Sequence, residues 1–292
     1  MSSVAEIRHH IRVVGDIHKI TKAMYLISSA KIKKAMRMHD QNLVYFLRVR
    51  SDIRFIMENM ELPIRNPYYR RHGKKTGYVV IAGDKGLCGG YNSEIMKLAK
   101  KTIQDGVHER RFLLTIGHIA GDYFTHLGMH PDVKFLHVIQ DPTLRHARDI
   151  TTLLCKLFRD KELDEVYIIY TMLEKVGKLT PTVLRLLPVL PEDFANAAIL
   201  HPPTTRLTFH PSAEEVLDAM VPHYLTGLVY SALVQSYASE HSARMEAMDS
   251  ATRNAEEMID DLSLELNHAR QSQITQEIAE IISGNPDQGA SL

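Results

Sequence analysis

This sequence has few cysteines, no net charge and no long apolar run. Its two cysteines, Cys88 and Cys155, are too few for a disulfide framework or a cysteine-based zinc site, and they fit a reducing compartment. Lys plus Arg equals Asp plus Glu at 35 each, so no overall field favours nucleic acid as the main partner. Apolar runs such as "YVVIA" are far shorter than the roughly 20 residues that span a bilayer. The start, "MSSVAEIRHH", lacks the apolar core of a secretory signal, so we expect a cytoplasmic protein.

Proline is absent from both ends of the chain. None occurs before Pro63, and none lies between Pro222 and Pro286. Within these stretches only Gly15 and Gly227 could interrupt a helix, since proline and glycine are the main helix breakers. The sequence therefore predicts one long helix over residues 1–62 and another over 212–284.

Both predicted helices carry a seven-residue apolar repeat, which is typical of a left-handed coiled coil. Because the two segments lie at opposite ends of one chain, we expect 212–284 to fold back antiparallel against 1–62. The polar template positions between residues 18 and 42 either set the register or mark the level where the partner changes. The template positions are Ile7, Ile11, Val14, His18, Thr21, Tyr25, Ser28, Ile32, Ala35, His39, Asn42, Phe46, Val49, Ile53, Ile56 and Met60, then Met245, Met248, Thr252, Ala255, Ile259, Leu262, Leu266 and Ala269, with Ile274, Ile278 and Ile281 after a phase slip.

The central segment, residues 76–200, has a different residue pattern from the two ends. The β-branched runs "TGYVVIA", "RFLLTIG", "VKFLHVI" and "EVYIIYTML" alternate with helix-like segments at 91–104, 118–128 and 143–160. Such alternation predicts a parallel or mixed sheet covered by helices. From Arg185 onward the proline-rich stretch predicts an extended return to the last helix. The predicted fold class is α/β, with a long antiparallel coiled coil of the terminal helices and a central Rossmann-like domain.

The segment "GDKGLCGGYNSEI", residues 83–95, has the glycines of a phosphate-binding loop but not its pattern. It lacks the Lys-Ser/Thr pair of a Walker loop, and its glycines do not have the spacing of the dinucleotide fingerprint. A tight turn between strand and helix is the better interpretation. Sixteen histidines raise the possibility of a metal site, but no HExxH or comparable ligand spacing is present, so we expect no metal.

Three segments resemble motifs of the gamma subunit of F-type ATP synthases. "DKGLCGGYN" is similar to that family's glycine-rich signature, in which an acidic and a basic residue precede Gly-Leu-Cys-Gly-Gly and an Asn follows. "IRVVGDIHKITKAMYLISSAKIKKA" resembles its N-terminal helix, with Lys-Ile-Thr-Lys-Ala-Met at 19–24. The segment 239–284 resembles its C-terminal helix. The motifs occur in the family's order and span essentially the whole chain.

The resemblance implies a non-catalytic rotor subunit of a bacterial-type enzyme. Its coiled coil would insert into the hexamer of alpha and beta subunits, and its α/β domain would stand on the membrane c-ring beside the epsilon subunit. One copy per complex would couple ion flow to ATP synthesis or hydrolysis, with no cofactor and no nucleotide of its own. The expected location is peripheral, at the cytoplasmic face of the plasma membrane. The choice of proton or sodium ion would lie with the partner subunits.

The same resemblance implies three sets of contact residues. Lys22 and Met24 would contact the beta subunits from the first helix, and Arg270 and Gln271 from the last. An apolar end would sit in a bearing at the top of the hexamer, and the loop with the segment before the last helix would lie on the c-ring or epsilon side. The bearing set is Ile278, Ile281 and Ile282; the foot set is Asp84, Lys85, Gly86, Leu87, Cys88, Phe209 and His210.

The chain departs from the family pattern at two places. His210 precedes Pro211 where many bacterial relatives carry an acid, and His9 and His10 replace a basic pair near the start. Two other functions stay open from the residues alone. A nucleotide-binding α/β enzyme with helical dimerisation arms would bind nucleotide near Gly83–Tyr91, and a stand-alone coiled-coil scaffold would form a stable symmetric dimer.

Overall fold

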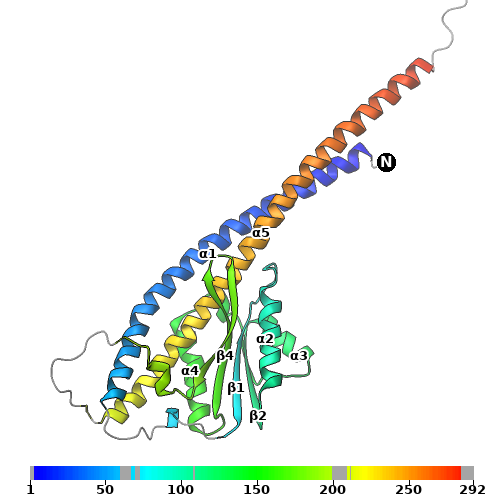
Figure 1. Ribbon diagram of the computed structural model, residues 1–292. Helices are drawn as coiled ribbons and strands as arrows, with labels where there is room; N and C mark the ends of the chain where they lie inside the picture. The colour runs from blue at the N-terminus through cyan, green and yellow to red at the C-terminus, as the bar shows by residue number, and fades with distance from the viewer. Residues whose placement is uncertain are drawn as a thin grey trace, which may run out of the picture. The chain divides into compact units, whose positions relative to one another are not determined.

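The computed structural model describes residues 3–59, 67–69, 73–107, 109–198, 209–210 and 212–283. The chain forms two compact units. The coiled-coil unit comprises Met1–Ile27 and Met245–Leu292, and the sheet unit comprises Ser28–Arg244. Two long helices, α1 (Val4–Glu58) and α5 (Ala213–Ser283), contribute to both units (Figure 1).

The coiled-coil unit is an antiparallel helix pair, as predicted. Thr252 Oγ1 lies 2.8 Å from Thr21 Oγ1, and Glu256 Oε1 lies 2.8 Å from His18 Nε2, so residue numbers rise on α5 as they fall on α1. Both helices rise equally per residue, so with this register the start of α1 lies beside about Ala269 of α5. Beyond that level α5 continues without α1 beside it (Figure 1), and its apolar side chains become exposed.

The sheet unit holds one five-stranded sheet in the order β3-β2-β1-β4-β5. Its elements are η1 (Pro67–Tyr69), β1 (Lys75–Ile81), α2 (Tyr91–Asp105), β2 (Arg110–Ile116), α3 (His118–His126), β3 (Val133–Phe135), η2 (Val138–Gln140), α4 (Leu144–Arg159), β4 (Glu165–Lys175), β5 (Lys178–Leu187) and η3 (Pro191–Phe194). The first four strands are parallel, and β5 runs antiparallel to β4. This is the mixed sheet with covering helices that the alternating pattern predicted.

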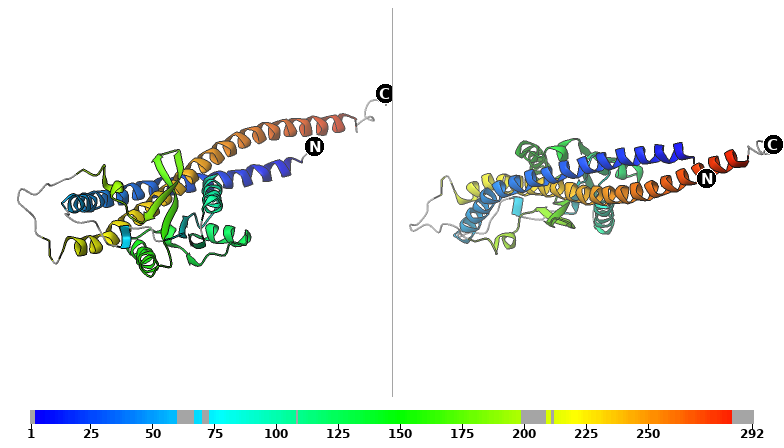
Figure 2. Two further views of the ribbon diagram at one scale, coloured as in Figure 1. Left: turned by 60° about the horizontal axis from the view of Figure 1, so that its bottom comes forward. Right: turned by 90° about the horizontal axis from the view of Figure 1, so that it is seen from above.

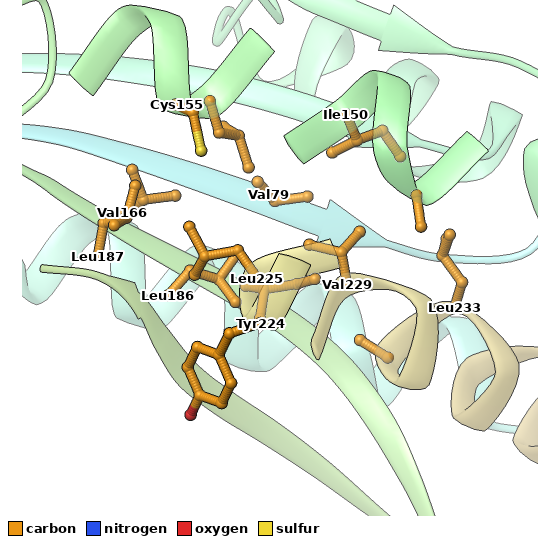
Figure 3. Close-up of a cluster of buried hydrophobic side chains, with 14 of the residues drawn as sticks. Val79, Ile150, Cys155, Val166, Leu186, Leu187, Tyr224, Leu225, Val229 and Leu233 are labelled. Carbon is orange, nitrogen blue, oxygen red and sulfur yellow. The ribbon is translucent and has the colours of Figure 1, made fainter. Parts of the chain in front are cut away.

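Helices bury both faces of the sheet, which explains the continuous apolar runs of its central strands. Alternate residues of β1 point to opposite faces: Tyr78 and Val80 join a cluster with α2 and α3, while Val79 and Ile81 pack with α4 and α5. Figure 3 shows Val79 between the α4 and α5 side chains. Helix α5, which continues into the coiled-coil unit, therefore packs against one face of the sheet.

Within the sheet unit α1 also packs against α5. Asn42 Nδ2 donates to the Gly227 carbonyl at 3.4 Å, and a Cβ at Gly227 would lie 2.9 Å from the Phe46 ring. The absence of a side chain at Gly227 thus lets the two helices approach closely at this point. Figure 2 shows α1 and α5 from two further directions. Phe46 stacks on Tyr224 at a ring-centroid distance of 5.4 Å.

One prediction about the sheet was wrong. Lys178–Leu187 forms a fifth strand, so the extended return does not begin at Arg185. Pro181 weakened the strand signal, but β5 is an edge strand, where a missing backbone N–H costs no ladder bond. Residues 199–208 of the predicted return lie outside the described residues, as does Met60 of the heptad template.

Candidate functional site

The glycine-rich loop follows β1 at the point where the strand order reverses. The chain builds β2 and β3 on one side of β1 and then places β4 on the other side. In open α/β sheets, ligands usually bind outside the carboxyl ends of the strands at such a reversal. The geometry of this loop therefore decides whether the domain has room for a nucleotide.

Asp84 ties the loop to the neighbouring elements. Its side chain is only 5% exposed; Oδ1 accepts from the backbone N–H of His118 at 2.9 Å, and Oδ2 accepts from Gln140 Nε2 at 2.8 Å. The carboxylate thus satisfies an unpaired N–H at the start of α3, where negative charge is favourable. Gly117, just before α3, has φ 94°, and a Cβ there would lie 2.2 Å from the Ala82 carbonyl oxygen, so the strand ends are closely apposed.

Helix α5 fills the place where a ligand would sit. Arg244 Nη2 donates to Glu240 Oε1 at 2.6 Å and to the Gly86 carbonyl at 3.0 Å. A Cβ at Gly83 would lie 3.2 Å from the Glu240 carboxyl carbon. Ser239 Oγ also donates to the Thr171 carbonyl at the end of β4, at 3.0 Å. The reversal point is therefore closed by the chain's own helix.

Cys88 and Asn92 stabilise the loop through contacts within it. Asn92 Oδ1 accepts from the backbone N–H of Gly83 at 2.9 Å, and its Nδ2 lies 3.1 Å from Cys88 Sγ. Burial raises the pKa of the Cys88 thiol, which disfavours the reactive thiolate. The motif residues Asp84, Cys88 and Asn92 thus act within the chain, while Lys85, Gly86 and Leu87 are exposed.

The predicted beta-contact residues lie on the coiled-coil unit with free polar groups. Lys22, Arg270 and Gln271 are exposed, and Met24 is half-buried. Within the described part of the chain, none of the three polar side chains makes a hydrogen bond or an ion pair. Other polar residues of α5 are paired along the helix, as Arg253 is with Asp249 at 2.8 Å.

The structure does not bring the two predicted contact pairs together. The register set by Thr21 and Thr252 places Lys22 opposite about residue 251. Arg270 lies some 19 positions further along α5, which corresponds to roughly 28 Å of helix. Lys22–Met24 and Arg270–Gln271 are therefore two separate levels of the coiled-coil unit.

The sequence reasoning missed a second apolar stripe on α1. Val13, Ile17, Ile20 and Ile27 are 42%, 47%, 60% and 55% exposed, and Met24 falls in the same row. These positions repeat every three or four residues, each directly before a template position from Val14 to Ser28, so the row lies about 100° around the helix from the seam. Scanning for a second heptad phase would have found it. We call this row the outer stripe.

The remaining predicted contact residues lie at other places. Ile278 and Ile281 are 51% and 72% exposed near the end of α5, and Ile282 belongs to the same helix. Phe209 packs against the core of the sheet unit, and His210 is exposed. Among the described residues no His, Cys, Asp or Glu cluster could hold a metal ion. The described helices include none with the length and apolarity needed to cross a bilayer.

Comparisons with known proteins agree with this geometry. The family model described as ATP synthase matches residues 3–286. The ATP synthase gamma chain of Ruminiclostridium cellulolyticum is 40% identical, covering 97% of this chain and 98% of its own. A sodium-ion-specific gamma chain of Acetobacterium woodii is 34% identical, covering 97% of each chain. A chain in the Euglena gracilis mitochondrial ATP synthase structure of OSCP, F1 and c-ring has a similar fold, with a TM-score of 0.63 and 14% identity over 99% of this chain and 97% of that one.

Proposed function

The chain belongs to the ATP synthase family whose curated members are named gamma chains, and from this premise we propose that it is the central-stalk rotor of an F-type ATP synthase. In this role it carries rotation between ion flow through the membrane c-ring and ATP chemistry in the beta subunits. It has no catalytic residue and no nucleotide site of its own. The closed reversal point of the sheet supports this assignment over a nucleotide-binding α/β enzyme.

The outer stripe is the observation that carries the proposal. A water-soluble coiled coil normally buries one apolar seam and keeps its other faces polar. Here Ile17, Ile20 and Ile27 stay about half exposed or more although the seam beside them is buried. An apolar row of this kind marks a surface that another protein covers. The hexamer of alpha and beta subunits is the partner that covers it in this proposal.

Two polar levels supplement the apolar row. Lys22 and Met24 contact the beta subunits at one level, and Arg270 and Gln271 at the other. The guanidinium group of Arg270 has no partner in the described part of the chain, so its planar fork is available for a partner carboxylate. Exposed ion pairs contribute only about 0–1 kcal/mol each, which suits contacts that form and break during rotation.

The end of α5 acts as the apical bearing. Ile278 and Ile281 are exposed and lie beyond the level at which α1 begins, so no described residue of α1 lies beside them. Ile278, Ile281 and Ile282 are the residues that the top of the hexamer holds in this proposal. A truncation after Gln276 should weaken assembly while leaving the sheet unit folded.

The sheet unit supplies the foot. In this proposal Asp84, Lys85, Gly86, Leu87, Cys88, Phe209 and His210 belong to the c-ring or epsilon side. They form two separate places, because the loop contacts Arg244, roughly 46 Å of helix from the start of α5 at Ala213. Of these, Leu87 is 65% exposed and is the apolar group of the loop most available to a partner. One copy per complex sits peripherally at the cytoplasmic face of the plasma membrane.

The test is co-purification of the tagged chain from its native cells, with an assay of ATP hydrolysis. We expect alpha, beta and epsilon subunits and an ATPase activity that the isolated chain lacks. Ile20→Asp should abolish recovery of the hexamer. Val107→Asp should not, because Val107 is 82% exposed in the sheet unit away from the outer stripe. A solitary chain that binds ADP would contradict the proposal.

A further inference from the structure

The sheet unit holds a polar cavity to which the proposed rotor function assigns no ligand, although two of its lining residues, Asp84 and Lys85, also belong to the foot set. It has a volume of about 100 Å³, which exceeds the ~10–15 Å³ needed for one water. Its walls come from four elements: α1, the glycine-rich loop, η2 and α5. The lining residues are Lys31, Asp84, Lys85, Ile139, Gln140, Glu240, His241 and Arg244.

Both acids of the cavity already accept hydrogen bonds from other groups of the chain. Asp84 accepts from the His118 backbone and from Gln140, and Glu240 accepts from Arg244. Arg244 accounts for one positive charge against these two negative ones. Lys31 and Lys85 add two more, and neither ammonium group has an acceptor among the residues that the structure describes. With His241 neutral, the cavity carries a surplus of one positive charge.

His241 supplies a further unpaired donor. Arg244 Nη1 lies 3.2 Å from His241 Nδ1, and because a guanidinium group only donates, Nδ1 must be the acceptor. The neutral ring then carries its proton on Nε2. The side chain is 6% exposed and lines the cavity, and no acceptor for Nε2–H is present in the described chain. Burial, aided by the charges of Lys31 and Arg244, lowers the pKa of His241 to about 3, which keeps this tautomer neutral.

We propose that this cavity binds a small oxyanion of the phosphate class, held by Lys31 Nζ, Lys85 Nζ and His241 Nε2–H. Residues from three different elements that carry donors without acceptors line the same cavity, where the net charge is positive. Only an acceptor-rich anion satisfies all three together, since water would leave the charge surplus in place. The closed reversal point excludes the rest of a nucleotide, so the ligand is the free oxyanion. A bound oxyanion would join α1, the loop and α5 at one point. This inference does not rest on the rotor function.

The experiment uses the isolated full-length chain at constant ionic strength. Inorganic phosphate is titrated by calorimetry and by thermal unfolding, with chloride, sulfate and ADP as parallel arms. We expect saturable phosphate binding with a dissociation constant in about the millimolar range, equivalent to about −4 kcal/mol. At ten times that concentration the folding equilibrium constant should rise about 11-fold.

Variants decide whether the cavity is the site. Lys31→Met and Lys85→Met should each weaken phosphate binding at least tenfold. Lys33→Met is the matched control, because Lys33 is exposed on the same helix as Lys31 but does not line the cavity. The proposal is overturned if chloride acts as strongly as phosphate, if ADP binds more tightly than phosphate, or if the two cavity variants bind like the control. Each of these results leaves co-purification with the hexamer unaffected, so this inference and the rotor function fail separately.

Discussion

The sheet unit and the coiled-coil unit treat polar and apolar side chains in opposite ways. The sheet unit buries ionised groups in its interior: Glu240 and Arg244 are 6% and 8% exposed. Both units expose large apolar groups, such as Val107 at 82% in the sheet unit, but in the coiled-coil unit Val13, Ile17, Ile20 and Ile27 form one row. The buried pair of the sheet unit is satisfied within the chain, so its charges require no partner protein. A unit that leaves an apolar stripe in water requires a partner.

The seam of the coiled-coil unit adds to this contrast. Thr21 is buried and pairs with Thr252, and His18 meets Glu256, so polar contacts hold the register where most coiled coils use apolar side chains. Such contacts specify alignment but contribute little net stability. The seam therefore combines polar contacts that fix the register with buried apolar side chains such as Val14 and Met248.

The largest effect should come from breaking the buried ion pair. Arg244→Met leaves the Glu240 carboxylate buried without its partner and should reduce the free energy of unfolding by about 3–5 kcal/mol. Urea denaturation followed by circular dichroism measures it. Arg253→Met, which breaks the exposed pair with Asp249, should cost less than about 1 kcal/mol. Equal losses in the two variants would remove the contrast between the units. The double variant Glu240→Gln/Arg244→Met should recover most of the loss.

Two isoleucine variants, one in each unit, compare a buried apolar side chain with an exposed one. Ile81→Ala, at a fully buried position of β1, should lower the free energy of unfolding by about 2–5 kcal/mol. Ile20→Ala, on the outer stripe, should change it by no more than about 0.5 kcal/mol in the isolated chain. The order should reverse for assembly, where Ile20→Ala reduces hexamer recovery. A large stability loss for Ile20→Ala would mean that the stripe is covered within the chain.

The pH dependence of stability separates His241 from the other buried groups. Its pKa is lowered to about 3, whereas an unfolded histidine titrates near 6.5. Between these two pH values the unfolded state binds a proton that the folded state does not bind. Stability therefore falls as pH drops below 6.5, by about 2 kcal/mol at pH 5. Burial raises the pKa of Glu240, which acts in the opposite direction. Urea denaturation of wild type and His241→Gln should give profiles that diverge below pH 6.5; parallel profiles would contradict the prediction.

Arg270→Ala should have the smallest effect on the chain and a visible one on the complex. Arg270 is exposed and its side chain makes no hydrogen bond or ion pair in the described part of the chain, so helicity and unfolding should stay unchanged. Coupled ATP turnover should fall if Arg270 binds a beta-subunit carboxylate as proposed, because alanine has no group that could donate to that carboxylate. Gln273→Ala is the control, since Gln273 is paired with Glu277 on its own helix. A loss of helicity in Arg270→Ala would show a structural role instead.

Much of the architecture was predictable because it rests on local patterns. Proline-free ends and heptads indicated both long helices and their antiparallel pairing, and β-branched runs indicated four of the five strands. Strand β5 was missed because Pro181 removes the local signal, and only the edge position makes it tolerable. The outer stripe could also have been predicted from the sequence. It was missed because one heptad phase was enough to predict the helix, and no second phase was tested.

The sequence by itself determined the two long helices, the order of the first four strands along the chain and the family motifs, since these depend on residue periodicity, helix breakers and residue order. Only the tertiary structure decided what the glycine-rich loop does. Asp84, Cys88 and Asn92 lie within ten residues, but the groups that give the loop its role, Glu240 and Arg244, come from α5 more than 140 residues later. Whether a loop holds a ligand or its own helix depends on which groups fill the space beside it, and that is settled by packing between distant segments.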